Sequence, residues 1–305
     1  MPTNQGSLRL FRLAGIEVFL HWSWFLVAVW EIQAGARRFS NVGWSAAEYL
    51  ALFLIVLLHE FGHALACRQV GGKAERIVLW PFGGVAYVQP PQRPGATLWS
   101  IAAGPLVNVA LMPVLLGLGY LANSAGWYAA SPDFHQFVRA VSIINAILFV
   151  FNILPIYPLD GGQILRSLLW FVIGRARSLM VATVIGFVGI AGYFALAVWL
   201  GSFWMIGLAI FLFLNCWAGL QSARVLARIM NAPRRENFAC PACHAAPPMG
   251  ENWKCSTCKQ PFDTFVTLAK CPHCYSQFPR TQCFECGQAT PIAQWTTGSA
   301  AAANP

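Results

Sequence analysis

Charged side chains are scarce in this chain of 305 residues. Only 10% of the residues are charged and 57% are hydrophobic, whereas soluble domains average about 25% charged residues. The stretch from Ser178 to Ala223 contains no Asp, Glu, Lys or Arg at all. A membrane-spanning helix needs about 20 apolar residues, so this stretch is long enough for two spans. The composition excludes an ordinary soluble domain and indicates an integral membrane protein.

The sequence also shows no evident cleavable signal peptide. The N-terminus is polar through Arg12, and no clear small-residue cleavage site follows it. We predict an all-α multi-pass membrane protein with about six transmembrane helices. The expected spans are 15–32, 44–67, 98–121, 140–159 and the two within 178–223, which Gly201 and Ser202 separate.

Acidic residues are fewer than basic ones, which gives a net charge of +9. The basic residues fall almost entirely on one side of the six predicted spans. This distribution argues against a nucleic-acid-binding surface as the reason for the net positive charge. This asymmetry follows the positive-inside rule and predicts that both termini are cytoplasmic. The predicted inner segments contain Arg9, Arg12, Arg68, Lys73, Arg76, Arg93, Arg166, Arg175, Arg177, Arg224, Arg228, Arg234 and Arg235, against Arg37, Arg38 and Arg139 outside.

The second predicted span contains the sequence His59-Glu60-Phe61-Gly62-His63. Residues four apart lie on the same face of a helix, so His59 and His63 can bind one metal ion, with Glu60 beside it as a general base. Three ionisable groups within one span are costly and usually serve a function. The alternative is a pair of histidines that form hydrogen bonds between helices, with Glu60 near an aqueous edge.

A catalytic zinc needs a third protein ligand. Asp160 is the only carboxylate between Asp133 and Glu236, and it follows the fourth span. Pro155 and Pro158 interrupt helical hydrogen bonding just before it, and irregular backbone at membrane depth is tolerated where it is buried in protein. Beside the histidine pair we predict Asp160 as the third ligand; the alternative is a helix-end carboxylate at the interface.

The chain resembles the site-2 protease family of intramembrane zinc metalloproteases over about residues 10–225. The resemblance rests on the 59–63 motif, on Ala103-Gly104-Pro105-Leu106-Val107-Asn108, and on Asn152 with Pro155 and Pro158-Leu-Asp-Gly-Gly162. It implies one catalytic Zn²⁺ bound by His59, His63 and Asp160, with Glu60 as base. It also implies that Asn108 lines the active site and that Asn152 helps to position substrate. The alternative for Asn108 is a hydrogen bond between helices.

Residues 75–89 form two runs rich in β-branched and aromatic residues, interrupted by Pro-Phe-Gly-Gly. This pattern predicts a small β-hairpin. A substrate helix must unwind before its peptide bonds become accessible, and an unwound segment can add to a strand edge. We therefore predict that Gly83, Gly84 and Val85 contact substrate; the alternative is a hairpin that only plugs the cytoplasmic side.

Eight of the ten cysteines form four Cys-x-x-Cys pairs after residue 239. In a reducing cytoplasmic tail such pairs favour metal over disulfides. We predict two structural Zn²⁺ in a tandem zinc ribbon, a small domain whose folding depends on metal. Four Lys/Arg and three Asp/Glu between Cys240 and Cys286 argue for a regulatory protein partner over nucleic acid. The predicted sets are Cys240, Cys243, Cys255 and Cys258 for one zinc, and Cys271, Cys274, Cys283 and Cys286 for the other.

The composition changes near residues 231–236. We predict a transmembrane core over 1–230, the zinc ribbon over 231–290 and a disordered tail over 291–305. The function expected is regulated proteolysis of single-span membrane proteins within the bilayer of a prokaryotic plasma membrane. A zinc transporter and a non-catalytic scaffold that binds membrane helices are the rivals. Transport needs no base beside the histidine, so Glu60 favours hydrolysis. The sequence does not specify the oligomeric state.

Overall fold

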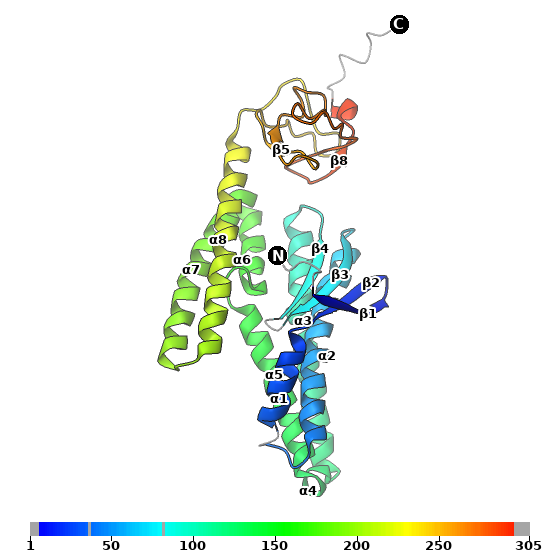
Figure 1. Cartoon of the computed structure of the whole chain (residues 1–305), viewed down its shortest axis with the longest axis vertical. Helices are drawn as coiled ribbons and strands as arrows, with labels where there is room; N and C mark the ends of the chain where they lie inside the picture. The colour runs from blue at the N-terminus through cyan, green and yellow to red at the C-terminus, as the bar shows by residue number, and fades with distance from the viewer. Residues whose placement is uncertain (1–5, 36–37, 81–82, 296–305) are drawn as a thin grey trace.

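The structure is a computed structural model that describes residues 6–35, 38–80 and 83–295. In these residues five helices are long and apolar enough to cross a membrane. They form the elongated part of the molecule (Figure 1), and the small cysteine-rich domain caps one end. The five are α2 (Val42–Gln69), α3 (Pro94–Ser124), α5 (Pro132–Ile153), α7 (Arg175–Trp199) and α8 (Phe203–Asn231).

The first predicted span, residues 15–32, is wrong. Its first half is strand β2 (Ile16–His21), and its second half belongs to the short helix α1 (Trp24–Gly35). Alternate residues of β2 are buried, which is the pattern of a strand with one face on the core. An apolar run of this length can form either element, and here pairing with a strand far along the chain decides the outcome.

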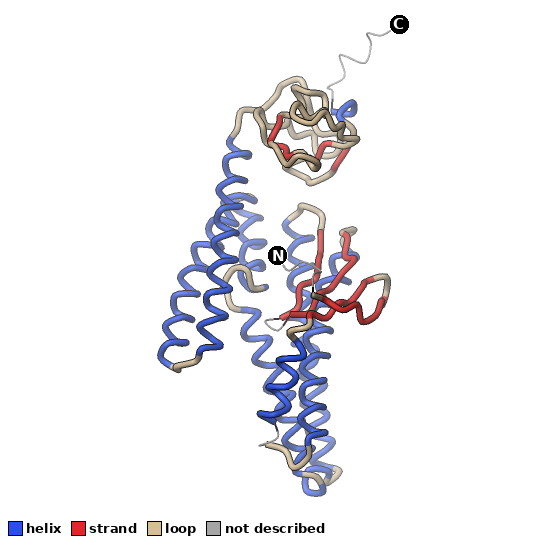
Figure 2. The backbone as a smooth tube through the Cα atoms, viewed as in Figure 1, coloured by secondary structure: helices blue, strands red, loops and turns tan. Residues whose placement is uncertain are grey.

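The predicted hairpin is part of a larger sheet. Strands β3 (Lys73–Trp80) and β4 (Gly83–Gln89) pair antiparallel, and β2 pairs parallel with β3. Strand β1 (Ser7–Leu13) pairs with β2, so the order is β1-β2-β3-β4 with β4 at one edge. Figure 2 shows the sheet beside the helices. It packs on α2 through buried side chains that include Val18, Ile77, Leu57 and Phe61.

Two short helices complete the core. Helix α4 (Trp127–Ala130) lies at the end opposite the cysteine-rich domain (Figure 1). Helix α6 (Asp160–Ile173) begins at the predicted metal ligand. The turn between α7 and α8 falls at Gly201 and Ser202, as the sequence predicts.

The cysteine-rich domain follows α8, which ends at Asn231. It contains two antiparallel strand pairs and packs around a cluster of cysteine and aromatic side chains. The prediction of disorder from residue 291 is wrong for 291–295. These residues include a 3-10 helix, and Trp295 is buried against Phe265 at 5.1 Å between ring centroids. Residues 296–305 lie outside the described residues. The strands are β5 (Trp253–Lys254), β6 (Pro261–Phe262), β7 (Thr281–Gln282) and β8 (Ala289–Thr290), and the 3-10 helix is η1 (Ile292–Trp295).

Candidate metal and catalytic site

Helix α2 brings His59, Glu60 and His63 together, and each is only 6% exposed. The two imidazoles lie on one face because they are four residues apart. Each Nδ1 faces an oxygen of a neighbouring helix: that of His59 lies 2.7 Å from Asn108 Oδ1, and that of His63 lies 2.9 Å from the Ser100 carbonyl oxygen. Because both oxygens accept, each Nδ1 carries the proton and each Nε2 presents a lone pair.

The three predicted ligand atoms converge. His59 Nε2 lies 3.0 Å and His63 Nε2 lies 3.3 Å from Asp160 Oδ2, and the two Nε2 atoms are 3.1 Å apart. Two imidazole lone pairs and a carboxylate oxygen repel one another at these distances. A cation among them converts the repulsion into coordination, and imidazole and carboxylate donors suit Zn²⁺. The donor set therefore fits a divalent metal ion.

The position of Asp160 depends on the two glycines after it. A Cβ on Gly161 would lie 2.1 Å from the Ile153 carbonyl oxygen, and one on Gly162 would lie 2.5 Å from the Tyr157 backbone nitrogen. Such distances are sterically impossible, so only glycine lets α6 begin this close to the end of α5. The close start directs the Asp160 side chain at the histidine pair.

Gly104 on α3 forms the wall of the metal site. A Cβ there would lie 2.3 Å from His63 Nε2 and 2.8 Å from His59 Nε2. Any side chain at this position would therefore occupy the space that the ligand atoms face. The sequence places Gly104 in the motif that resembles the site-2 protease family but does not indicate this role.

Asn108 is fully buried and its side-chain oxygen faces His59; its contact with substrate stays a prediction. Its amide nitrogen donates to Asn145 Oδ1 at 2.9 Å, and the Asn145 amide donates to the Asn108 carbonyl at 3.0 Å. This reciprocal pair fixes which atom of Asn108 faces His59. Sequence reasoning missed Asn145, although an amide within an apolar span is itself a signal.

Strand β4 lies against Glu60. The Ala86 backbone N–H donates to Glu60 Oε2 at 2.8 Å, and a Cβ on Gly84 would lie 2.2 Å from Glu60 Cγ. Of the predicted substrate residues, Gly84 therefore contacts the proposed base. Gly83 begins the strand, and Val85 is 37% exposed. Asn152 is half-buried near the end of α5; its role in positioning substrate stays a prediction, as does substrate contact by Gly83, Gly84 and Val85.

The cysteines form two clusters of four, but the predicted grouping is wrong. Each Cys-x-x-Cys pair with the two residues between its cysteines is here called a knuckle. The first and fourth knuckles form one cluster, and the second and third knuckles form the other. Ligand atoms within each cluster lie within 4.8 Å of one another. The Sγ atoms of Cys240 and Cys286 are 3.7 Å apart, and those of Cys255 and Cys274 are 3.5 Å apart. The clusters are Cys240, Cys243, Cys283 and Cys286, and Cys255, Cys258, Cys271 and Cys274.

Packing at the ends of the domain explains this grouping. The Ala239 N–H donates to the Trp295 carbonyl at 2.8 Å, which joins the segment before the first knuckle to the segment after the last. Within the inner cluster, burial favours the neutral Cys255 thiol, but the N–H groups of Cys258 and Thr257 outweigh it and lower the pKa to about 6. A thiolate is the form that binds metal.

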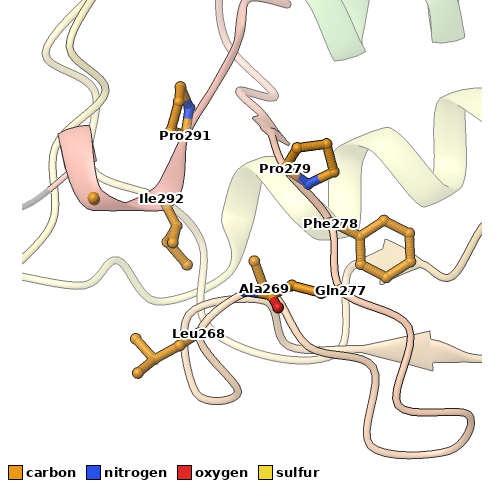
Figure 3. Close-up of a pocket in the computed structure, with 8 residues that line it drawn as sticks. Leu268, Ala269, Gln277, Phe278, Pro279, Pro291 and Ile292 are labelled. Carbon is orange, nitrogen blue, oxygen red and sulfur yellow. The ribbon is translucent and has the colours of Figure 1, made fainter.

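This domain has a surface pocket whose lining includes none of the cysteines. Residues 268–269, 277–279 and 291–293 line it, and Figure 3 shows Ile292 approaching Leu268 and Ala269. The end of the described chain therefore packs on the domain and extends its surface.

The comparisons with known proteins agree with this geometry. Residues 47–130 and 119–196 match peptidase family M50. A zinc metalloprotease of Methanocaldococcus jannaschii is 33% identical over 180 residues, which cover 59% of this chain and 50% of that one. The putative zinc metalloprotease YwhC of Bacillus subtilis is 31% identical over 162 residues, covering 43% of this chain and 74% of that one.

A solved site-2 protease from Methanocaldococcus jannaschii matches with a TM-score of 0.52 and 28% identity, over 70% of this chain and 95% of that one. The chain spans only 50 to 61% of the length of the first three curated relatives. The fold and the site together define an integral membrane protein with a buried donor set that fits a metal ion. The chain belongs to peptidase family M50.

Proposed function

We propose that this protein is a zinc metalloprotease that hydrolyses peptide bonds of membrane-spanning proteins, in regulated intramembrane proteolysis. The observation that carries the proposal is the convergence of His59, His63 and Asp160 beside a buried Glu60. The family and its curated zinc metalloproteases support the same activity. A transporter would not require a carboxylate next to the metal ligands, whereas here Glu60 is adjacent to His59 in the chain and its carboxylate accepts from the Ala86 N–H.

A zinc ion at this site would acidify a water molecule and polarise the scissile carbonyl. The protein's own residues supply the remaining steps. Glu60 takes the proton from the water and returns it to the leaving nitrogen. Asn108 and the Ser100 carbonyl keep both imidazoles in the tautomer that leaves Nε2 free. Single-span proteins in the bilayer are the proposed substrates, and an unwound segment adds as a strand to the free edge of β4.

The experiment that tests this function uses the purified protein in liposomes with a single-span protein tagged at both ends. We expect two tagged fragments, their loss after chelation, and their return when Zn²⁺ is added. Zinc flux across the liposome without fragments would favour the transporter. Neither flux nor fragments, for a panel of single-span proteins, would favour the scaffold.

The cysteine-rich domain contacts the core through the knuckle at residues 283–287. Arg175 Nη1 at the start of α7 donates to the Phe284 carbonyl at 2.9 Å, next to Glu285, which pairs within the domain with Arg234 at 3.1 Å. A Cβ on Gly287 would lie 2.5 Å from Cγ of Gln92, which precedes α3. The knuckle therefore touches both the sheet side and the α7–α8 side of the core. Figure 1 shows the domain over the end that carries the sheet.

We propose that this docked knuckle restrains the protease and that a regulatory protein bound to the zinc ribbons relieves the restraint. Strand β1 and the cysteine-rich domain lie toward the same end of the long helices (Figure 1), and the basic residues gathered there support placing this end, and both termini, in the cytoplasm of a prokaryotic cell. Arg175→Ala removes one docking contact. We expect faster hydrogen exchange of the amides in 283–287 and a higher fragment yield.

Arg177→Ala is the control, because Arg177 is exposed and lies two residues further along the same helix. Exchange and yield that stay unchanged in Arg175→Ala would rule out the restraint.

A further inference from the structure

The contact between Glu60 and β4 uses a backbone group on the free edge of the sheet. Among the strands of the described residues, β4 is at the end of the sheet order and pairs with β3 on one side only. In an antiparallel pair the N–H groups of a strand point alternately toward and away from the partner. The Ala86 N–H points at Glu60 on α2. It therefore lies on the side of β4 that faces away from β3.

Gly84 brings the carboxylate close enough for this bond. Its missing side chain leaves the space in which the Glu60 side chain lies, since a Cβ would come within 2.5 Å of Cδ and Oε1 as well as 2.2 Å from Cγ. The Glu60 side chain therefore lies directly against β4.

A substrate segment that adds to this edge needs the same backbone groups. Strand addition gains its affinity from main-chain hydrogen bonds, and the available donors are the outward N–H groups of the edge strand. One N–H carries one proton, so Ala86 cannot donate fully to both Glu60 and a substrate carbonyl. A buried carboxylate that loses its donor must find another polar partner. His63, His59 and Asp160 are the ionisable groups that interact electrostatically with Glu60, and a water molecule bound at the metal site would provide that partner.

We propose that the Ala86 N–H holds Glu60 in the substrate-free protein and passes to the substrate backbone when a strand adds to β4, which frees Glu60 to act as base. This inference rests on the proposed proteolysis and on strand addition to β4. It gives Ala86 a positioning role that acts through Glu60. The base becomes available only where a substrate occupies the edge.

Ala86→Pro tests the inference, because proline removes the N–H and is tolerated at outward-facing positions of edge strands. The substrate loses one backbone hydrogen bond while Glu60 is already free. We expect KM to rise about 2- to 12-fold, the effect of one hydrogen bond, with kcat unchanged or higher. Ala86→Gly, which keeps the N–H, is the reference. Replacing the Ala86 amide by an ester removes the N–H without adding the proline ring. It should also raise KM and leave kcat unchanged or higher.

A second readout does not depend on activity. With ¹⁵N-labelled alanine, Glu60→Ala should shift the Ala86 amide resonance in the free protein, and the shift should vanish when both proteins are saturated with a strand-forming substrate peptide. A shift that persists in the saturated proteins would overturn the inference. So would a tenfold fall in kcat at unchanged KM in the proline and ester variants, because the N–H would then position Glu60 during catalysis. Absence of cleavage by the wild-type protein would instead contradict the proposed function.

Discussion

Glu60→Gln is expected to reduce kcat for peptide-bond cleavage by about 10²- to 10⁴-fold, the usual contribution of a general base. Glutamine has nearly the shape of glutamate, and its carbonyl oxygen can still accept from the Ala86 N–H. It cannot take a proton from water at neutral pH. The metal ligands are untouched, so metal content should equal that of the wild type. The measurements are fragment formation from a tagged single-span protein and metal analysis of the same preparation.

Glu48→Gln is the matched control. Glu48 lies in the same helix, is also 6% exposed, and pairs with Arg38 at 3.1 Å away from the metal site. This variant tests whether loss of any buried carboxylate from α2 disables the protein, and we expect it to cleave. Proteolysis at the wild-type rate by purified Glu60→Gln would remove Glu60 from the mechanism.

The long helices could be predicted from the sequence because a bilayer imposes a length and an apolar composition on each span. The strands could be predicted only in part. Two runs rich in β-branched and aromatic residues around a Pro-Phe-Gly-Gly break indicated the hairpin of β3 and β4, but β2 pairs with a strand that follows the whole of α2. Long-range pairing of this kind leaves no local pattern, so the apolar residues of β2 and α1 resembled one span.

The groups of the candidate site also fall into those that the sequence indicates and those that only the fold reveals. His59, His63 and Asp160 stand out because ionisable side chains are rare in apolar segments. The Ser100 carbonyl and the Ala86 N–H do not, because every residue except proline carries both groups and only the fold decides which ones face the site. Likewise, Cys-x-x-Cys spacing indicates each knuckle but not its partner. Tertiary contacts such as that between Ala239 and Trp295 bring the first and last knuckles together.

Asp160→Ala is expected to remove the catalytic metal and leave the other metal sites intact. Chelation cannot separate these sites, since it also strips the thiolate clusters. Removing the carboxylate leaves two imidazoles, which are too few ligands for a catalytic zinc. Loss of a residue that merely supports a ligand weakens metal binding about 10- to 100-fold, so loss of the ligand itself should exceed about 100-fold. Bound zinc should fall by one equivalent, and cleavage should disappear.

The measurement is zinc content at buffered free zinc concentrations, with the two cysteine clusters as an internal reference in the same molecule. Asp133→Ala is the control, because Asp133 contacts Ser40 and lies outside the site. Unchanged zinc content in Asp160→Ala would exclude Asp160 as a ligand. The short distances between its oxygen and the two Nε2 atoms would then need another explanation, because three unprotonated acceptors do not approach one another to 3.0–3.3 Å without a proton or a cation among them.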